Sequence, residues 1–207
     1  MMQNGGVKTK GPFDTPEQRF HAGRLGMWLF LMALAVLFCA TIIGFLVMRL
    51  QSEAWAELDL PTLPAGLWIS TALLIVSSGT MHWALRSARN SRAVAVRAAL
   101  VMTSALGLGF LLLQGQAWLQ WAEGLESALM DVDDEQMRFA ATGFYVMTGI
   151  HAAHVLGGML PLLWITGRAF AGAYHARRWA PVYFMAAYWH FLDIVWVVLF
   201  VTLLLGI

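Results

Sequence analysis

Cysteine and charge are both scarce in this sequence of 207 residues. Because Cys39 is the only cysteine, the chain cannot form an internal disulfide, a zinc knuckle, or a copper or iron–sulfur centre that takes several thiolates from it. Asp, Glu, Lys and Arg make up 12% of the residues, which is about half of their usual share in soluble domains. A composition so poor in charge argues against a water-soluble enzyme.

Motifs for nucleotide binding and hydrolysis are missing as well. The sequence contains no Walker loop, no dinucleotide fingerprint, and no Ser, His and Asp arrangement in a supporting context. The basic turn from Arg86 to Arg92 is too short for a nucleic-acid surface, and we expect Arg86 and Arg89 to contact anionic lipid headgroups instead. We therefore expect no catalytic residue and no nucleic-acid partner in this chain.

Long apolar runs dominate what is present. Hydrophobic residues make up 59% of the sequence, and five runs reach the roughly 20 residues that a helix needs to cross a bilayer. These runs predict an all-α, polytopic membrane protein with five transmembrane helices, over residues 25–48, 63–85, 98–118, 139–165 and 180–207. We expect residues 25–207 to form the membrane domain. Residues 1–24 contain no apolar core and are expected to be a flexible cytoplasmic segment rather than a signal peptide.

The distribution of Lys and Arg predicts the orientation of the spans. With the N-terminus in the cytoplasm, all of the 13 Lys and Arg residues except Arg49 and Arg138 lie on the inner side. Most acidic residues then lie outside, including the run from Asp131 to Glu135. We interpret this run as a solvated loop, although it could also attract a basic partner or a cation. Five spans place the C-terminus outside.

One acidic residue must lie within a span. Asp193 follows His190 by three residues, so that both lie on one helical face, and an ionisable residue at membrane depth indicates function by default. At about 1.5 Å of rise per residue, His190 and His154 lie roughly 15 and 16 Å from the inner ends of their spans. Asp193 and His151 both lie at roughly 20 Å. Because a short inner loop joins the last two spans, we expect the four side chains to form one polar layer between neighbouring helices.

Three interpretations of this layer remain open from the residues alone. The side chains could pair with one another so that none is left unpaired in lipid. The histidines could ligate haem b, although axial pairs need well-separated depths and these histidines cluster at one depth. The layer could also relay protons through Asp193, although a continuous pathway needs more ionisable groups.

Small and aromatic residues mark surfaces for packing. Gly157 and Gly158 would let another helix approach closely. Trp28, Trp189 and Trp196 are expected to contact lipid or neighbouring subunits, with the last two flanking the His190 and Asp193 pair.

The sequence resembles subunit III of the haem–copper terminal oxidases. The run Tyr-Trp-His-Phe-Leu-Asp-Ile-Val-Trp over 188–196 is similar to the C-terminal signature of that family, and residues 148–158 are similar to its Thr-Gly-x-His-x-x-His-Val run. Weaker agreement occurs at residues 26–31, 77–80 and 112–114. The resemblance extends from about Leu25 to the C-terminus.

The resemblance implies a non-catalytic subunit of a respiratory oxidase. The five-helix form would lack the two N-terminal helices of the seven-helix form, as in many bacterial members, and would lie in the bacterial inner membrane. This chain would hold no metal, since haem and copper would be held by partner subunits I and II, and cytochrome c would donate the electrons. Subunit III would stabilise subunit I, bind phospholipids between its helices and protect the oxidase from inactivation during turnover, while the complex couples oxygen reduction to proton pumping.

Two departures from the family pattern concern carboxylates. Leu34 occupies the position of an intramembrane glutamate, and Gln116–Ala117 replaces a second acid after the Leu-Leu-Gln motif. A proton antenna built on these acids is therefore not expected, which favours the scaffold role.

Other functions stay open at this point. The same resemblance includes subunits of quinol oxidases and of the nitric oxide reductase branch. A free-standing membrane cytochrome with haem b is an alternative of a different class.

Overall fold

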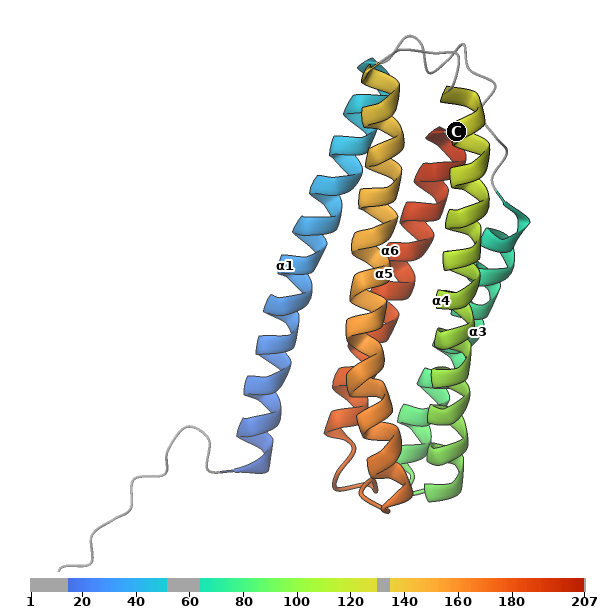
Figure 1. Ribbon diagram of the computed structural model, residues 1–207. Coiled ribbons are helices and arrows are strands. Elements are labelled where there is room, and N and C mark those ends of the chain that lie inside the picture. The colour runs from blue at the N-terminus through green and yellow to red at the C-terminus, as the bar shows by residue number, and fades with distance from the viewer. Residues whose placement is uncertain (1–14, 52–63, 130–134, 207) are drawn as a thin grey trace, which may run out of the picture.

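The computed structural model describes residues 15–51, 64–129 and 135–206, and it leaves out the side chains of residues 125–141. The described residues form five helices and no strand (Figure 1): α1 (Pro16–Gln51), α3 (Ala65–Arg89), α4 (Ala93–Leu129), α5 (Glu135–Phe170) and α6 (Ala180–Gly206). The predicted all-α class is therefore confirmed for these residues.

Helix α1 begins earlier than hydrophobicity predicted. The Thr15 hydroxyl accepts a hydrogen bond from the Gln18 backbone N–H, and the Gln18 side-chain carbonyl accepts one from the Thr15 N–H, both at 3.2 Å. This reciprocal pair is a capping box, and Pro16 suits the first helical position because its missing N–H would have no helical partner there. Residues 16–24 of the expected flexible segment are thus helical, whereas residues 1–14 lie outside the described residues.

The helices run side by side along one axis, with α6 inside the bundle (Figure 1). Helix α6 contacts α3, α5 and α1, and the most extensive pairing is between α3 and α4. A tight turn joins α3 to α4, in which Ser91 adopts a left-handed conformation with φ of 54°. Residues 171–179 join α5 to α6 at the same end of the bundle (Figure 1).

Four of the described helices are long and apolar enough to cross a membrane, namely those over Pro16–Gln51, Ala93–Gly124, Thr142–Phe170 and Ala180–Leu205. Helix α3 has 25 residues, and its apolar run is interrupted by hydroxyl-bearing residues: Ser70, Thr71, Ser77, Ser78 and Thr80. The polytopic membrane character is confirmed, and four of the five expected spans correspond to these helices.

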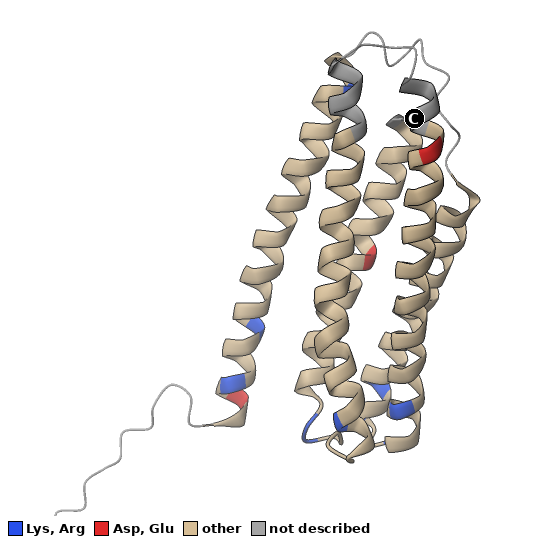
Figure 2. Ribbon diagram, in the orientation of Figure 1, with Lys and Arg blue, Asp and Glu red and all other residues tan. Residues whose placement is uncertain are grey.

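Basic side chains gather at one end of the bundle. Figure 2 shows most of the described Lys and Arg residues near the start of α1 and the two loops at that end. The acidic run from Asp131 to Asp134 lies outside the described residues. The described Lys and Arg residues thus follow the asymmetry that the sequence shows for basic residues.

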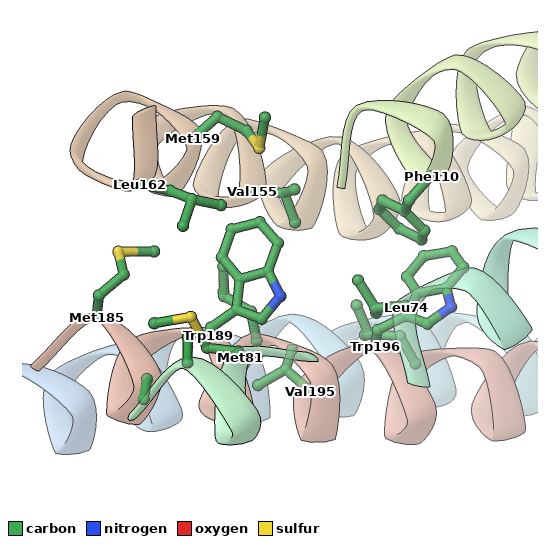
Figure 3. Packing of buried hydrophobic residues seen from close by; sticks show 14 of the residues in the cluster. Leu74, Met81, Phe110, Val155, Met159, Leu162, Met185, Trp189, Val195 and Trp196 are labelled. Carbon is green, nitrogen blue, oxygen red and sulfur yellow. The ribbon is translucent and has the colours of Figure 1, made fainter. Parts of the chain in front are cut away.

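Two tryptophans of α6 form the centre of the core. Trp189 points toward α5, where Val155, Met159 and Leu162 surround it (Figure 3). Trp196 lies about two turns further along the same face of α6, against Phe110 of α4, with ring centroids 5.1 Å apart. Both are almost fully buried, and truncation of such a side chain to Ala costs about 3–5 kcal/mol.

Candidate functional site

Helix α6 presents its chemically distinctive residues on two different faces. Trp189 and Trp196 are seven residues apart, so that both point into the bundle. Their indole N–H groups donate to hydroxyls of α3, at 3.0 Å to Ser77 and at 2.9 Å to Thr71. The two tryptophans expected at lipid or subunit surfaces therefore lie in the chain's own core, where they join α6 to α3.

His190 and Asp193 lie on the neighbouring face and are directed toward α3. Ser78 Oγ and His190 Nδ1 form a hydrogen bond of 2.7 Å. Asp193 Oδ2 lies 3.8 Å from His190 Nδ1, which is within the range of an ion pair but too long for a hydrogen bond. Asp193 is buried, with only 7% of its surface exposed, and yet neither of its carboxyl oxygens has a hydrogen-bond partner among the described residues.

His151 of α5 is enclosed by aromatic rings. Its imidazole stacks on Trp196, with ring centroids 5.1 Å apart and an interplanar angle of 30°, and the rings of Phe38 and Phe110 meet it edge-on. The residue is fully buried, and neither ring nitrogen has a hydrogen-bond partner among the described residues. The buried side-chain amide of Gln114, on α4, is likewise unpaired within the described part of the chain.

His154 lies one turn further along α5 and bonds within its own helix. Its Nδ1 is 2.7 Å from the Ile150 carbonyl oxygen, and because a carbonyl can only accept, this nitrogen must donate. Tyr188 of α6 donates its hydroxyl to the His154 carbonyl at 2.8 Å. The hydrogen bond between α5 and α6 at this level is thus made by Tyr188, which the sequence analysis did not place in the polar layer.

The expected polar layer therefore divides into two groups. His190 and Asp193 are joined to α3 through Ser78, whereas His151 and His154 pack against Phe38 on the other side of α6. The depths alone did not reveal this difference, because residues at one depth can point in different directions around a helix. Within the described residues, no group of three or more His, Cys, Asp or Glu side chains lies close enough to hold a metal ion.

The two adjacent glycines of α5 have different surroundings. A Cβ atom on Gly158 would lie 2.6 Å from Cε1 of Tyr188, so that α6 can approach only because this residue has no side chain. A Cβ on Gly157 would meet no described atom within 4 Å, because this residue is exposed. Trp28, on α1, is 59% exposed and remains a candidate for lipid or subunit contact.

A basic pocket of about 540 Å³ opens at the end of the bundle where α1 begins. Its lining includes Arg168, Arg177, Arg178 and His21, with Glu17 as the one acidic residue among the lining residues. A second, largely apolar groove of about 470 Å³ shares Trp164 and Pro181 with this pocket. The groove extends between α1, α5 and α6, and its other lining residues are Met27, Phe30, Gly157, Ile165, Phe184, Met185, Tyr188 and Pro161.

The arginines expected at lipid headgroups lie at this same end. The Arg89 guanidinium is placed over the Trp179 ring, 4.5 Å from its centroid, so that it contacts the loop before α6. Arg86 is exposed in the last turn of α3. Ser91 adds a second connection, since its hydroxyl accepts a hydrogen bond of 2.9 Å from the Ala176 N–H.

Comparison with known proteins agrees with this architecture. Residues 16–205 match the family described as cytochrome c oxidase subunit III. The chain is 31% identical to cytochrome c oxidase subunit 3 of Thermostichus vulcanus over 186 residues, covering 86% of this chain and 85% of the relative. It is 32% identical to the subunit of the same name from Bacillus subtilis, covering 85% of this chain and 82% of that protein. Quinol oxidase subunit 3 of Bacillus subtilis is 26% identical, over 93% of this chain and 91% of the relative.

The matched residues extend from the first turn of α1 almost to the end of α6, and they include both aromatic and polar faces of that last helix. The family resemblance inferred from the motifs is therefore confirmed. The chain belongs to the cytochrome c oxidase subunit III family and is a membrane subunit of a haem–copper terminal oxidase complex.

Proposed function

We propose that this chain is the lipid-binding scaffold subunit of its oxidase, with no redox centre of its own. The basic pocket and the adjoining apolar groove support the proposal most strongly. Arg168, Arg177 and Arg178 provide charge and hydrogen-bond donors that suit a phosphate group. The groove that shares Trp164 with the pocket is largely apolar and has a volume of about 470 Å³, which suits an acyl chain.

The ligand would be an anionic phospholipid whose headgroup lies in the basic pocket. Lipid analysis of the purified oxidase tests this assignment. Replacing Arg168, Arg177 and Arg178 together by Gln should lower the amount of retained anionic phospholipid. Arg92→Gln is the matched control, because Arg92 is exposed at the same end but does not line the pocket. Equal lipid content in both variants would contradict the assignment.

The scaffold role is also supported by the absence of acids at the two family positions. Leu34 is buried on α1, and Ala117 is buried on α4, so that both positions contribute apolar packing. Haem and copper would then be held by subunits I and II, against which this chain packs. Purification of the tagged chain should also recover a partner subunit that shows the absorption of haem and copper. A haem spectrum from the isolated chain itself would instead favour a free-standing membrane cytochrome with haem b.

We further propose that all five helices span a bacterial inner membrane, with the N-terminus inside and the C-terminus outside. Helix α3 belongs in this set because its 25 residues extend about 38 Å and it runs beside α4. The single cysteine makes the test simple. In a Cys39→Ser background, a membrane-impermeant thiol reagent applied to intact cells should label Ala65→Cys and leave Ser91→Cys unlabelled.

Cytochrome c is the proposed electron donor of the complex. The relatives include subunits named for cytochrome c oxidases and one named for a quinol oxidase. Oxygen consumption by the purified complex with reduced cytochrome c, compared with a reduced quinol, distinguishes the two donors. If the complex consumed oxygen with quinol but not with cytochrome c, the chain would be a subunit of a quinol oxidase instead.

A further inference from the structure

The basic pocket at the start of α1 takes its opposite charges from different elements. Helix α1 contributes Glu17 and Phe20, which are three residues apart and therefore neighbours on the helix surface. The last turn of α5 contributes Arg168, and the loop before α6 contributes Arg177 and Arg178. Within the described residues, no ion pair joins Glu17 to any of these three arginines.

The Glu17 side chain is exposed in the first turn of α1, where the helix dipole favours an acidic residue. Because Glu17 and the arginines line one pocket, an anion that binds the arginines also meets this carboxylate. Phe20 and Trp179 line the same pocket, with ring centroids 5.1 Å apart, and aromatic faces attract ammonium groups. The α1 side of the pocket therefore suits a cationic group.

Phospholipid headgroups differ in how well they match these charges. Phosphatidylglycerol has a phosphate for the arginines but no cation for Glu17, so the carboxylate would repel it. Phosphatidylethanolamine has an ammonium group, but its phosphate is the only anionic group that it offers to the arginines. Phosphatidylserine has a phosphate and a carboxylate, which arginine binds well, and an ammonium group for Glu17.

We propose that the basic pocket selects an anionic phospholipid whose headgroup also carries an amino group, the chemistry of phosphatidylserine, and that Glu17 binds the ammonium group. This inference rests on the proposed function, because it specifies the headgroup of the lipid that the pocket is proposed to bind. The arginines bind the phosphate and carboxylate oxygens. Glu17 then determines which anionic lipid is preferred.

The test measures which lipid the purified oxidase retains. The complex, stripped of lipid in detergent, is mixed with equal amounts of dioleoyl phosphatidylserine, phosphatidylglycerol and phosphatidylethanolamine, and the bound lipids are quantified by mass spectrometry. The wild type should retain phosphatidylserine best. Glu17→Gln should lower retention of phosphatidylserine and raise that of phosphatidylglycerol, because it removes both the attraction and the repulsion. Since exposed ion pairs change an affinity by up to about fivefold, the ratio of the two lipids should fall about two- to fivefold.

Two variants and one soluble compound serve as controls. Glu17→Asp keeps the carboxylate and should keep the preference for phosphatidylserine. Glu123→Gln neutralises another exposed acid, which belongs to α4 and does not line the pocket, and it should leave the lipid ratio unchanged. Glycerophosphoserine has the same headgroup without acyl chains, and at the same concentration it should not displace the lipid.

Three results would overturn the inference. They are equal retention of phosphatidylserine and phosphatidylglycerol by the wild type, a change of both lipids in the same direction in Glu17→Gln, and displacement of the lipid by glycerophosphoserine. If replacing the three arginines by Gln left lipid retention unchanged, the proposed function would fail and this inference with it. Retention of phosphatidylglycerol that depends on the arginines, without a preference for phosphatidylserine, would refute this inference alone.

Discussion

Gly158 offers a sharp test of how α5 and α6 pack. A Cβ atom added there would lie 2.6 Å from Cε1 and 3.3 Å from Cδ1 of Tyr188, far inside van der Waals contact. The tyrosine ring has little freedom to retreat, because its hydroxyl donates to the His154 carbonyl at 2.8 Å. Gly158→Ala must therefore displace either the ring or the whole helix.

The energetic cost follows from these two contacts. Overpacking of a close contact costs about 1–3 kcal/mol, and loss of a typical hydrogen bond costs about 0.5–1.5 kcal/mol. Ala has a higher helix propensity than Gly, which offsets up to about 1 kcal/mol of this cost. Gly157→Ala receives that gain without the clash, since no described atom lies within 4 Å of its added Cβ. We expect the two variants to differ by about 3 kcal/mol, which is more than about a hundredfold in the unfolding equilibrium.

The measurement is reversible unfolding of the isolated chain in mixed detergent micelles, with increasing fractions of SDS. Gly158→Ala should lower the free energy of unfolding, and Gly157→Ala should keep or raise it. Equal free energies for the two variants would show that α5 and α6 do not meet at Gly158 as described.

The remaining predictions concern single contacts of the core and of the loop between α5 and α6. Trp189→Phe should lower the free energy of unfolding by about 1–3 kcal/mol, because the side chain loses volume and its hydrogen bond to Ser77. A double-mutant cycle with Ser77→Ala should give a coupling energy of about 1 kcal/mol between the two residues. A coupling energy of zero would show that this hydrogen bond does not form. His151→Leu should change the free energy of unfolding little, because neither ring nitrogen has a partner to lose, and a large loss would reveal one. Burial raises the pKa of Tyr174 above its ordinary value of 10.0, and the charge of Arg168 opposes this rise. The contribution of Tyr174 to the free energy of unfolding is therefore fully present below pH 10 and is lost as pH rises through the folded-state pKa. Thermal unfolding between pH 9 and 11 should therefore show a smaller loss of stability at high pH for Tyr174→Phe than for the wild type, and equal losses would contradict this.

The sequence predicted where the helices lie better than where they begin. Hydrophobicity identifies the segment that lipid can cover, and each of the five expected segments lies almost wholly within one helix of the structure. Hydrophobicity does not reveal the polar turns by which a helix continues beyond its apolar segment. The start of α1 at Pro16 was readable from a different signal, the Thr15-Pro16-Glu17-Gln18 pattern of a capping box, which hydrophobicity ignores.

The direction of side chains around α6 was harder to predict than their depth. The rise per residue places His151 and Asp193 at one depth, but apolar residues occur all around α6, so no single apolar stripe shows which face meets α5. The spacing did hold part of the answer. Trp189 and Trp196 share a face because they are seven residues apart, and Asp193, four residues after the first and three before the second, lies at the edge of that face. Knowing which face meets α3 required the positions of Ser77 and Ser78.

The bonds between α6 and α3 also constrain when the protein can mature. Trp189 and Ser77 are 112 residues apart in the chain, and Trp196 and Thr71 are 125 apart, so neither bond can form until the last helix has been synthesised and inserted. A chain interrupted before α6 would therefore make neither bond, and α3 would keep only its pairing with α4 among the extensive helix contacts.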